Sequence, residues 1–529
     1  MKAQDTIHKS SASRFPIFLI LIISACGLSF AFSPFPLRFL AYFALIGLFW
    51  AIDRSTGKKA FWYGFLFGGV FAFCHLWWLY FLVVPVAPAT KFLLLLGVTV
   101  LFAYLGLYTA VFALITKYTG LVFAPFIWAG LEFIRTKSEI SFPWGFLGYT
   151  QTPYIPFIQM ASISGVYGIS AWLVWINLLI YWLIKQLKPQ AVGAGFSLRT
   201  KKEPSLKVSV FWRALTISII LVLSFLLPLL YGVIRVKPNQ NWLKVAIIQP
   251  NVSPYDKGDW ESRNKIQSDL VKLTEQAIIH EPKLLVYPET ATLTDITRDR
   301  EFQNVLQKII DSSGIYLLTG TPIYDREVRG RYYNGAVLFE PKKDIAQGYR
   351  KIHPVPFSEK IPYADVIPLF KKLETADMGD MTPGKIFRVF NFPYGRFSVL
   401  ICFESIYPDL TQEFTKRGAN FLINITNDGW FGRTPGPHQH AELAILRTVE
   451  NGVPLLRCAN NGLSFIVDPY GRVMDKTGLF TQSVLIDSLP PPIKPTFFRQ
   501  HGNIFALLSL CLIGFGLVLR RLRVTKRKD

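Results

Sequence analysis

Long apolar segments occupy both ends of this 529-residue chain, and they restrict its fold more than any other feature. About 20 apolar residues in a helix are enough to cross a bilayer. We predict spans near 15–34, 36–53, 60–84, 90–116, 119–136, 164–185, 212–234 and 502–520. Because 242–490 has ordinary globular composition, we expect a membrane domain at 1–241, a globular domain at 242–490, and a last span with a basic tail at 491–529.

Lysine and arginine residues gather beside the apolar segments and explain the net charge of +22. The densest basic runs are 185–213 and 520–528. Such residues accumulate in cytoplasmic loops, so their alternation along the chain predicts that both termini are cytoplasmic. Seven crossings would then put the globular domain on the outer face of the membrane. Since membrane topology accounts for the charge, we do not expect a nucleic acid partner.

Two short patterns suggest sites that we do not assign. Ile23-Ser24-Ala25-Cys26 looks like the lipobox of a secretory signal, but the sequence after it stays apolar, which favours an uncleaved first span. His438 and His440 have no acidic or cysteine partner in register, so they make a poor metal-ligand set. We therefore expect no metal and no cofactor.

The globular region alternates short apolar runs with helical patterns, which is typical of a layered α/β domain. We expect strands at 244–249, 284–287, 315–320, 333–339, 397–403, 421–425, 455–459 and 464–467. A helix at 440–451 is expected before the last two strands. An earlier helix is indicated by apolar residues that share one face, at Ile266, Leu270, Leu273 and Ala277.

One of these strands ends in a cysteine, and we take this residue as a candidate nucleophile. The run from Val399 to Cys402 is apolar, and a buried strand of this kind can deliver a side chain to the rim of a pocket. The thiolate is the reactive form, so the cysteine needs a neighbouring base or charge. Glu289 and Lys351, each beside an apolar segment, are candidates. On its own, Cys402 would also fit an ordinary buried core cysteine.

The order Glu289, Lys351, Cys402 resembles the Glu-Lys-Cys triad of the carbon–nitrogen hydrolase (nitrilase) superfamily. The neighbouring sequence fits it too, at 287–290, 351–359, 402–404, 424–432 and 457–462. With spans before and after, the chain is similar to the apolipoprotein N-acyltransferase family, the membrane-embedded branch. The resemblance implies a multi-span α-helical membrane domain plus an extracytoplasmic α/β nitrilase-like domain, an αββα sandwich.

The resemblance also implies roles for individual residues. Cys402 would attack an acyl carbonyl, Glu289 would take the thiol proton, and Lys351 would stabilise the oxyanion. Glu359 and Glu404 match glutamates that support the family's site. Surface ion pairing is the alternative for these two carboxylates.

Two tryptophans are candidate substrate-binding residues. Trp260 matches an aromatic residue implicated in substrate binding, with plain packing as the alternative. Trp144 follows the fifth span, where an aromatic belt residue is the alternative. The chain departs from the family at Phe403, where a tyrosine is expected, and at Ser358 and Pro354. These departures put individual oxyanion and substrate contacts in doubt, but not the triad.

The implied reaction moves an acyl chain from a membrane phospholipid to Cys402, and then to the α-amine of a diacylglyceryl-cysteine on an apolipoprotein. The implied location is the bacterial inner membrane, with the catalytic domain in the periplasm. An apolar loop such as 362–384 would keep water from the thioester. Two alternatives remain from the sequence: a membrane-tethered hydrolase that uses water as acceptor, and a transporter with a non-catalytic outer domain.

Overall fold

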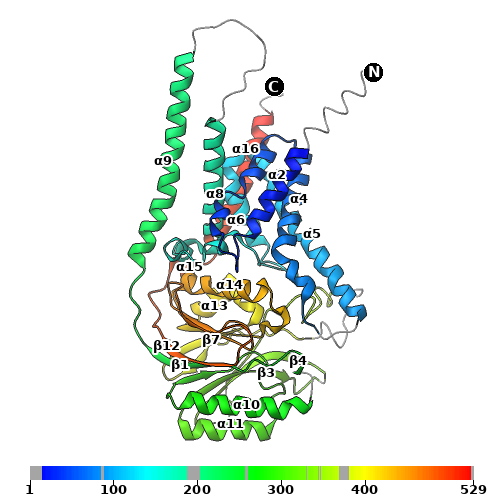
Figure 1. Ribbon diagram of the computed structural model, residues 1–529, viewed down its shortest axis with the longest axis vertical. Coiled ribbons are helices and arrows are strands. Elements are labelled where there is room, and N and C mark those ends of the chain that lie inside the picture. The colour runs from blue at the N-terminus through cyan, green and yellow to red at the C-terminus, as the bar shows by residue number, and fades with distance from the viewer. Residues whose placement is uncertain are drawn as a thin grey trace.

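The computed structural model describes residues 15–84, 88–187, 203–256, 260–328, 330–343, 345, 347–367 and 381–525. A bundle of helices forms one half of the molecule, and two sheets flanked by helices form the other (Figure 1). The bundle contains α2 (Phe15–Ser29), α3 (Ile46–Asp53), α4 (Gly57–Leu76), α5 (Pro88–Thr119), α6 (Ala124–Ile134), α7 (Ile155–Ile158), α8 (Ala161–Leu187), α9 (Glu203–Arg235), α15 (Phe497–His501) and α16 (Ile504–Thr525), with short 3-10 turns between them.

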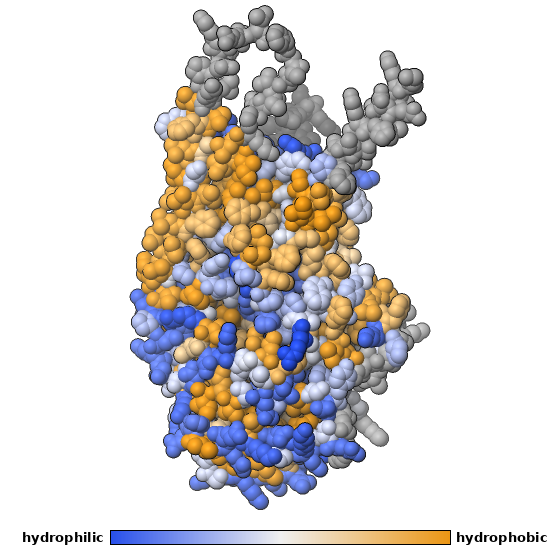
Figure 2. All heavy atoms as spheres, viewed as in Figure 1, coloured by the Kyte–Doolittle hydropathy of each residue, from blue (hydrophilic) through white to orange (hydrophobic). Residues whose placement is uncertain are grey.

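On the face shown in Figure 2, apolar side chains predominate over the helical half, whereas hydrophilic side chains are interspersed with apolar ones over the sheets. Among the described residues, the helices long and apolar enough to span a membrane are Gly57–Phe81, Thr90–Thr119, Ala161–Leu187, Val208–Arg235 and Ile504–Leu522. Five of the predicted spans are thereby confirmed as helices of spanning length. The predicted spans at 15–34 and 119–136 correspond to shorter apolar helices, Pro16–Ser29 and Leu121–Ile134.

The predicted span at 36–53 is not one continuous helix. It consists of the 3-10 turn η1 (Arg38–Tyr42) and the short helix α3, separated by a break. Asn177 of α8 satisfies the backbone at this break, because its amide accepts from Leu45 N (2.9 Å) and donates to the Ala41 carbonyl (2.8 Å). A buried polar side chain from another helix thus replaces helical hydrogen bonds, which the local sequence does not reveal.

The other half has four layers. Strands β1 (Leu243–Gln249), β2 (Leu284–Val286), β3 (Tyr316–Tyr324), β4 (Tyr332–Phe339), β5 (Gln347–Arg350) and β12 (Ser483–Leu489) form one sheet, in the order β12-β1-β2-β3-β4-β5. The second sheet has the order β11-β10-β9-β8-β7-β6 and comprises β6 (Phe390–Phe392), β7 (Gly395–Ile401), β8 (Phe421–Thr426), β9 (Leu455–Ala459), β10 (Phe465–Val467) and β11 (Val473–Lys476).

Helices α10 (Trp260–Ile278) and α11 (Arg300–Ser313) cover the outer face of the first sheet, and α13 (Pro408–Lys416) and α14 (Pro435–Asn451) cover that of the second (Figure 1). The predicted αββα fold class is therefore confirmed. The expected apolar face of α10 packs into one core with β1 and β2, through Ile266, Leu270, Leu273 and Ala277. The predicted strand at 397–403 is two residues too long, because β7 ends at Ile401 and a 3-10 turn begins.

Helix α14 joins the two halves through buried polar side chains. Glu442 forms an ion pair with Arg38 of η1. Glu450 accepts a hydrogen bond from Val166 N (3.0 Å), at the start of the regular part of α8, and forms an ion pair with Arg447 (3.1 Å). A carboxylate at a helix N-terminus is stabilised by the exposed N–H groups there. The half that contains the sheets is thus held to the bundle by one ion pair and by a buried carboxylate at the start of a helix.

We predict that Glu450→Ala destabilises the protein by about 3 to 5 kcal/mol, because Arg447 and Val166 N would lose a partner in a buried site. Thermal unfolding in detergent measures this change. Glu413→Ala is the matched control, since the Glu413–Arg417 pair is largely exposed and such pairs contribute little. Equal unfolding temperatures for the two variants would contradict the role assigned to Glu450.

Candidate active site

Cys402 lies directly after β7, as the first residue of the 3-10 turn η6 (Cys402–Ile406). Its φ is +52°, in the left-handed region, which costs a non-glycine residue roughly 1–2 kcal/mol. Such a conformation persists only where the surrounding structure holds it. The side chain is buried, with 9% of the residue exposed. The fold therefore presents this cysteine at the carboxyl end of a central strand, on a tightly held turn.

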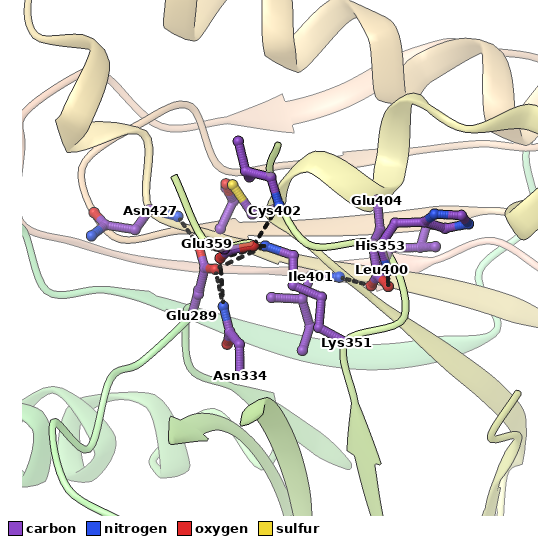
Figure 3. Close-up of polar contacts among 12 residues, drawn as sticks. Glu289, Asn334, Lys351, His353, Glu359, Leu400, Ile401, Cys402, Glu404 and Asn427 are labelled. Atoms are coloured by element: carbon purple, nitrogen blue, oxygen red, sulfur yellow. Dashed lines mark hydrogen bonds and ion pairs between the residues drawn. The ribbon is translucent and has the colours of Figure 1, made fainter. Parts of the chain in front are cut away.

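Lys351 follows β5 and points toward two carboxylates (Figure 3). Its Nζ lies 2.8 Å from the Glu359 carboxylate and 3.8 Å from Glu289 Oε1. Burial alone would lower the pKa of Lys351, but Glu359, Glu289 and Cys402 outweigh it and raise that pKa above its ordinary value. The ammonium group is therefore a fixed positive charge in the site.

Glu289, just after β2, is held by two donors. Its Oε1 accepts from Asn334 Nδ2 (2.6 Å) and its Oε2 from the backbone N of Asn427 (2.9 Å). Burial, followed by the charge of Glu289, raises the pKa of Cys402, whereas Lys351 lowers it. The net shift is upward, so the resting cysteine is a thiol and needs a base to become a nucleophile. Glu289 is the carboxylate whose charge acts most strongly on it.

Glu404 is fully buried and links the turn that carries Cys402 to the loop that carries Lys351. Its Oε2 accepts from Ile401 N (2.7 Å), and its Oε1 accepts from Ile352 N (2.7 Å), His353 N (3.1 Å) and Tyr349 Oη (2.7 Å). Burial raises the pKa of Glu404 to about 7 in spite of these donors. Its hydrogen bonds thus go to backbone next to Cys402 and Lys351.

Two further candidates from the sequence are the supporting residue Glu359 and the substrate-binding residue Trp260. Glu359 contacts Lys351 directly and also accepts from Val355 N (2.8 Å) and from Asn334 Nδ2 (3.3 Å). Trp260 begins α10, but its side chain lies outside the described residues.

Trp144 is buried at the junction of the two halves. Its Nε1 donates to Gln439 (2.9 Å), and its ring stacks on His440 at 5.5 Å. It also lines a pocket among helices α4, α5 and α6. The cavity has apolar walls that include Phe71 and Phe112, and polar groups at Arg135, Glu132, His75 and Tyr108.

Phe403 occupies the position where the family resemblance predicts a tyrosine, and its neighbours are aromatic. Its ring lies 6.0 Å from Phe142 and 5.6 Å from Tyr407. The predicted loop at 362–384 is described only at its two ends, since 368–380 lie outside the described residues. At its beginning, Tyr363 N donates to Glu139 of the membrane half (2.8 Å).

Sequence reasoning missed several residues that hold the charged groups in place. Asn334 on β4 touches both Glu289 and Glu359, and its carbonyl accepts from Lys351 N (2.8 Å). No short motif surrounds it, so only the antiparallel pairing of β4 with β5 could have identified it. Asn427 lies inside the motif at 424–432, where its neighbours gave a signal. Within the described ranges, no cluster of three or more His, Cys, Asp and Glu side chains could hold a metal.

Known proteins resemble this chain over nearly its whole length. Residues 24–179 match the family described as apolipoprotein N-acyltransferase N-terminal domain, and 244–492 match the carbon-nitrogen hydrolase family. The apolipoprotein N-acyltransferase of Geobacter metallireducens is 31% identical and covers 95% of this chain and 94% of the relative. That of Brucella melitensis is 31% identical, covering 92% of each. A solved structure, Nit3 of Saccharomyces cerevisiae from the nitrilase superfamily, has 21% identity and a TM-score of 0.37, covering 48% of this chain and 93% of Nit3.

We predict that Asn334→Asp makes Cys402 less reactive toward iodoacetamide. The variant replaces a donor by a third negative charge beside Glu289 and Glu359, which raises the pKa of the thiol further. One pKa unit corresponds to roughly a tenfold slower alkylation. Peptide mapping by mass spectrometry measures the rate at Cys402 alone. Asn391→Asp, on the exposed side of β6, is the control, and similar rates in both variants would contradict the prediction.

Proposed function

Because this chain belongs to the apolipoprotein N-acyltransferase family, we propose that Cys402, Glu289 and Lys351 perform its acyl transfer in two steps, through a thioester on Cys402. The chain is a membrane protein and an acyltransferase that acts in lipoprotein N-acylation. The observation that carries the triad is the convergence of one buried thiol, one ammonium and one carboxylate just after β7, β5 and β2, with the Glu359 carboxylate beside the ammonium (Figure 3).

In the first step, Glu289 takes the proton of the Cys402 thiol, and the sulfur attacks the ester carbonyl of a phospholipid. Lys351 stabilises the oxyanion of the tetrahedral intermediate, because its ammonium is fixed and desolvated. The intermediate collapses to a thioester, and the lysophospholipid alkoxide leaves with the proton that Glu289 held.

In the second step, the α-amine of the diacylglyceryl-cysteine attacks the thioester carbonyl. Glu289 takes a proton from the amine as the C–N bond forms, and the C–S bond breaks. The proton returns to the Cys402 sulfur, which restores the resting thiol. An amide is more stable than a thioester, so this step runs forward.

Glu359 and Glu404 support this chemistry in different ways. Glu359 contacts the ammonium of Lys351 and fixes its direction. Glu404 holds the backbone on both sides of the site. We assign substrate contact to Trp144 through the cavity that it lines, and keep Trp260 as a candidate substrate-binding residue.

The proposed acyl donor is a membrane phospholipid. The cavity at Trp144 lies in the helical half, and its apolar walls suit an acyl chain. Arg135 adds a positive charge at the same cavity, and its Nε has no hydrogen-bond partner among the residues that the structure describes. A guanidinium of this kind suits a phosphate group.

The proposed location is the bacterial inner membrane, with both termini in the cytoplasm and the catalytic half in the periplasm. Several basic residues lie at the end of the bundle that is farther from the sheets. Lys117 donates to the Asp53 carbonyl there, and Lys185 forms an ion pair with the Asp53 side chain (2.7 Å). The guanidinium of Arg520 in α16 lies over the ring of Tyr118 at the same end of the bundle. This clustering agrees with cytoplasmic loops rich in lysine and arginine.

We predict that the purified protein, mixed with phospholipid in detergent, gains the mass of one fatty acyl group, and that Cys402→Ala gains none. Intact mass spectrometry measures the adduct. A diacylated lipopeptide should discharge it much faster than water does. Equal discharge by water alone would favour a hydrolase, and an adduct on Cys402→Ala would remove Cys402 as the nucleophile.

We predict that Arg135→Gln raises the KM for phospholipid roughly tenfold, which corresponds to about 1.4 kcal/mol of binding. The kcat should change little, because Arg135 is placed to bind the donor and not to react with it. Steady-state kinetics with a fluorescent phospholipid in mixed micelles separate the two constants. Arg326→Gln, at an exposed site in the catalytic half, is the control. A fall in kcat with an unchanged KM would contradict this role.

A further inference from the structure

A buried network of polar side chains contacts the backbone carbonyl of Cys402. His440 of α14 places Nε2 3.2 Å from the Cys402 carbonyl oxygen and Nδ1 2.8 Å from Asp428 Oδ1. Arg457 of β9 donates to Asp428 Oδ2 (2.8 Å) and lies 3.1 Å from His440 Nδ1. All three side chains are almost completely buried. The acyl-transfer steps described above use none of them.

The hydrogen-bond pattern assigns the ring protons of His440. Nε2 faces the Cys402 carbonyl and the Ser405 hydroxyl (3.5 Å), and that hydroxyl already donates to the same carbonyl (3.1 Å). Neither oxygen is free to donate to Nε2, so Nε2 carries a proton. Burial and Arg457 lower the pKa of His440, against the opposing effect of the Asp428 carboxylate, which lies 2.8 Å from Nδ1. Arg457 can donate to Nδ1 of the neutral ring, and Asp428 can accept from Nδ1 when the ring gains a second proton.

We propose that His440 is a positioning residue for the acyl transfer, which donates from Nε2 to the Cys402 carbonyl and thereby fixes the peptide unit between Cys402 and Phe403. This inference rests on the proposed role of Cys402 as the nucleophile. Asp428 and Arg457 flank Nδ1 and fix the orientation of the ring, so that Nε2 faces the Cys402 carbonyl.

The peptide unit matters because of the conformation of Cys402. Its left-handed φ needs external support, and three donors meet on its carbonyl: His440, Ser405 and Asn424 (3.4 Å). In a trans peptide the C=O and the following N–H point in opposite directions. Fixing the Cys402 carbonyl against α14 therefore turns Phe403 N–H away from α14. That N–H opens a helical turn, where the first N–H groups have no partner within the turn.

The hydrogen bond from His440 polarises the peptide unit between Cys402 and Phe403 as well as orienting it. A donor on a peptide carbonyl strengthens the N–H of the same unit as a hydrogen-bond donor. Phe403 N–H is thereby prepared to receive negative charge that develops near the Cys402 sulfur. Loss of the hydrogen bond from Nε2 should slow formation of the thioester. It should not change the affinity for the lipid, because the ring of Trp144 separates His440 from the cavity that we assign to the acyl donor.

Two substitutions separate the Nε2 donor from the rest of the ring. In His440→Gln, the side-chain amide nitrogen can take the place of Nε2 and donate to Cys402. In His440→Asn, the shorter amide reaches only the position of Nδ1, so it keeps a contact with Asp428 and loses the one with Cys402. His438→Asn is the matched control, because His438 lies two residues away on the same helix and is only half-buried.

The experiment measures the rate and the KM of acyl adduct formation with a fluorescent phospholipid, together with the unfolding temperature. We expect His440→Asn to slow adduct formation by about 10- to 100-fold at an unchanged KM, as for other residues that orient a reacting group. His440→Gln should recover most of the rate, and His438→Asn should match the wild type.

Several results would overturn the inference. Equal losses in His440→Asn and His440→Gln, a wild-type rate in His440→Asn, or a rate that follows the unfolding temperature would each remove the positioning role. Cys402→Ala, measured alongside, tests the proposed function separately from the role of His440. An adduct on that variant defeats the proposed function itself, whereas no adduct there with a normal rate in His440→Asn defeats only the role of His440.

Discussion

The burial of polar side chains on α14 is the constraint on which the assembly of both halves depends. Glu442, Glu450 and Gln439 leave water when the sheets meet the bundle, and each finds its partner on the other half. A buried charge or amide without a partner is costly, whereas a matched one is tolerated. These matched partners favour the docking arrangement of α14 that the structure shows. That arrangement puts the cysteine turn next to the helical half, where Phe403 lies 6.0 Å from Phe142.

Much of the fold could be predicted from apolar patterns. The strands at 244–249, 421–425 and 455–459 are buried and apolar, and the structure confirms them. The pattern failed where polar residues form the element. The strand at Gln347–Arg350 pairs along β4 with no apolar run of its own. The segment at 36–53 is apolar enough for a helix, yet Asn177 from a distant helix stabilises a break in it. Long-range polar contacts of this kind leave no local signal.

The candidate site shows the same division. Glu289, Lys351 and Cys402 were identified by their order and their neighbouring motifs, and the structure brings them together. Their supports were not all predictable. Asn334 holds two carboxylates through a strand pairing, and Glu404 reaches backbone N–H groups from two segments of the chain. Supporting residues of this kind are selected by distance in three dimensions, so a linear sequence identifies them only where they lie inside a motif.

The hydrogen bonds of Gln439 have a consequence for how this family can diverge. Its carbonyl oxygen accepts from the indoles of Trp78 (3.1 Å) and Trp144 (2.9 Å), and its amide nitrogen donates to the His75 carbonyl (3.2 Å). A change at any one of the three side chains leaves a buried polar group unmatched in the others. Glutamine and the two tryptophans should therefore vary together among related sequences. A related sequence that lacks one of the two tryptophans should also carry a compensating substitution at the position of Gln439, so substitutions at these three positions should be correlated.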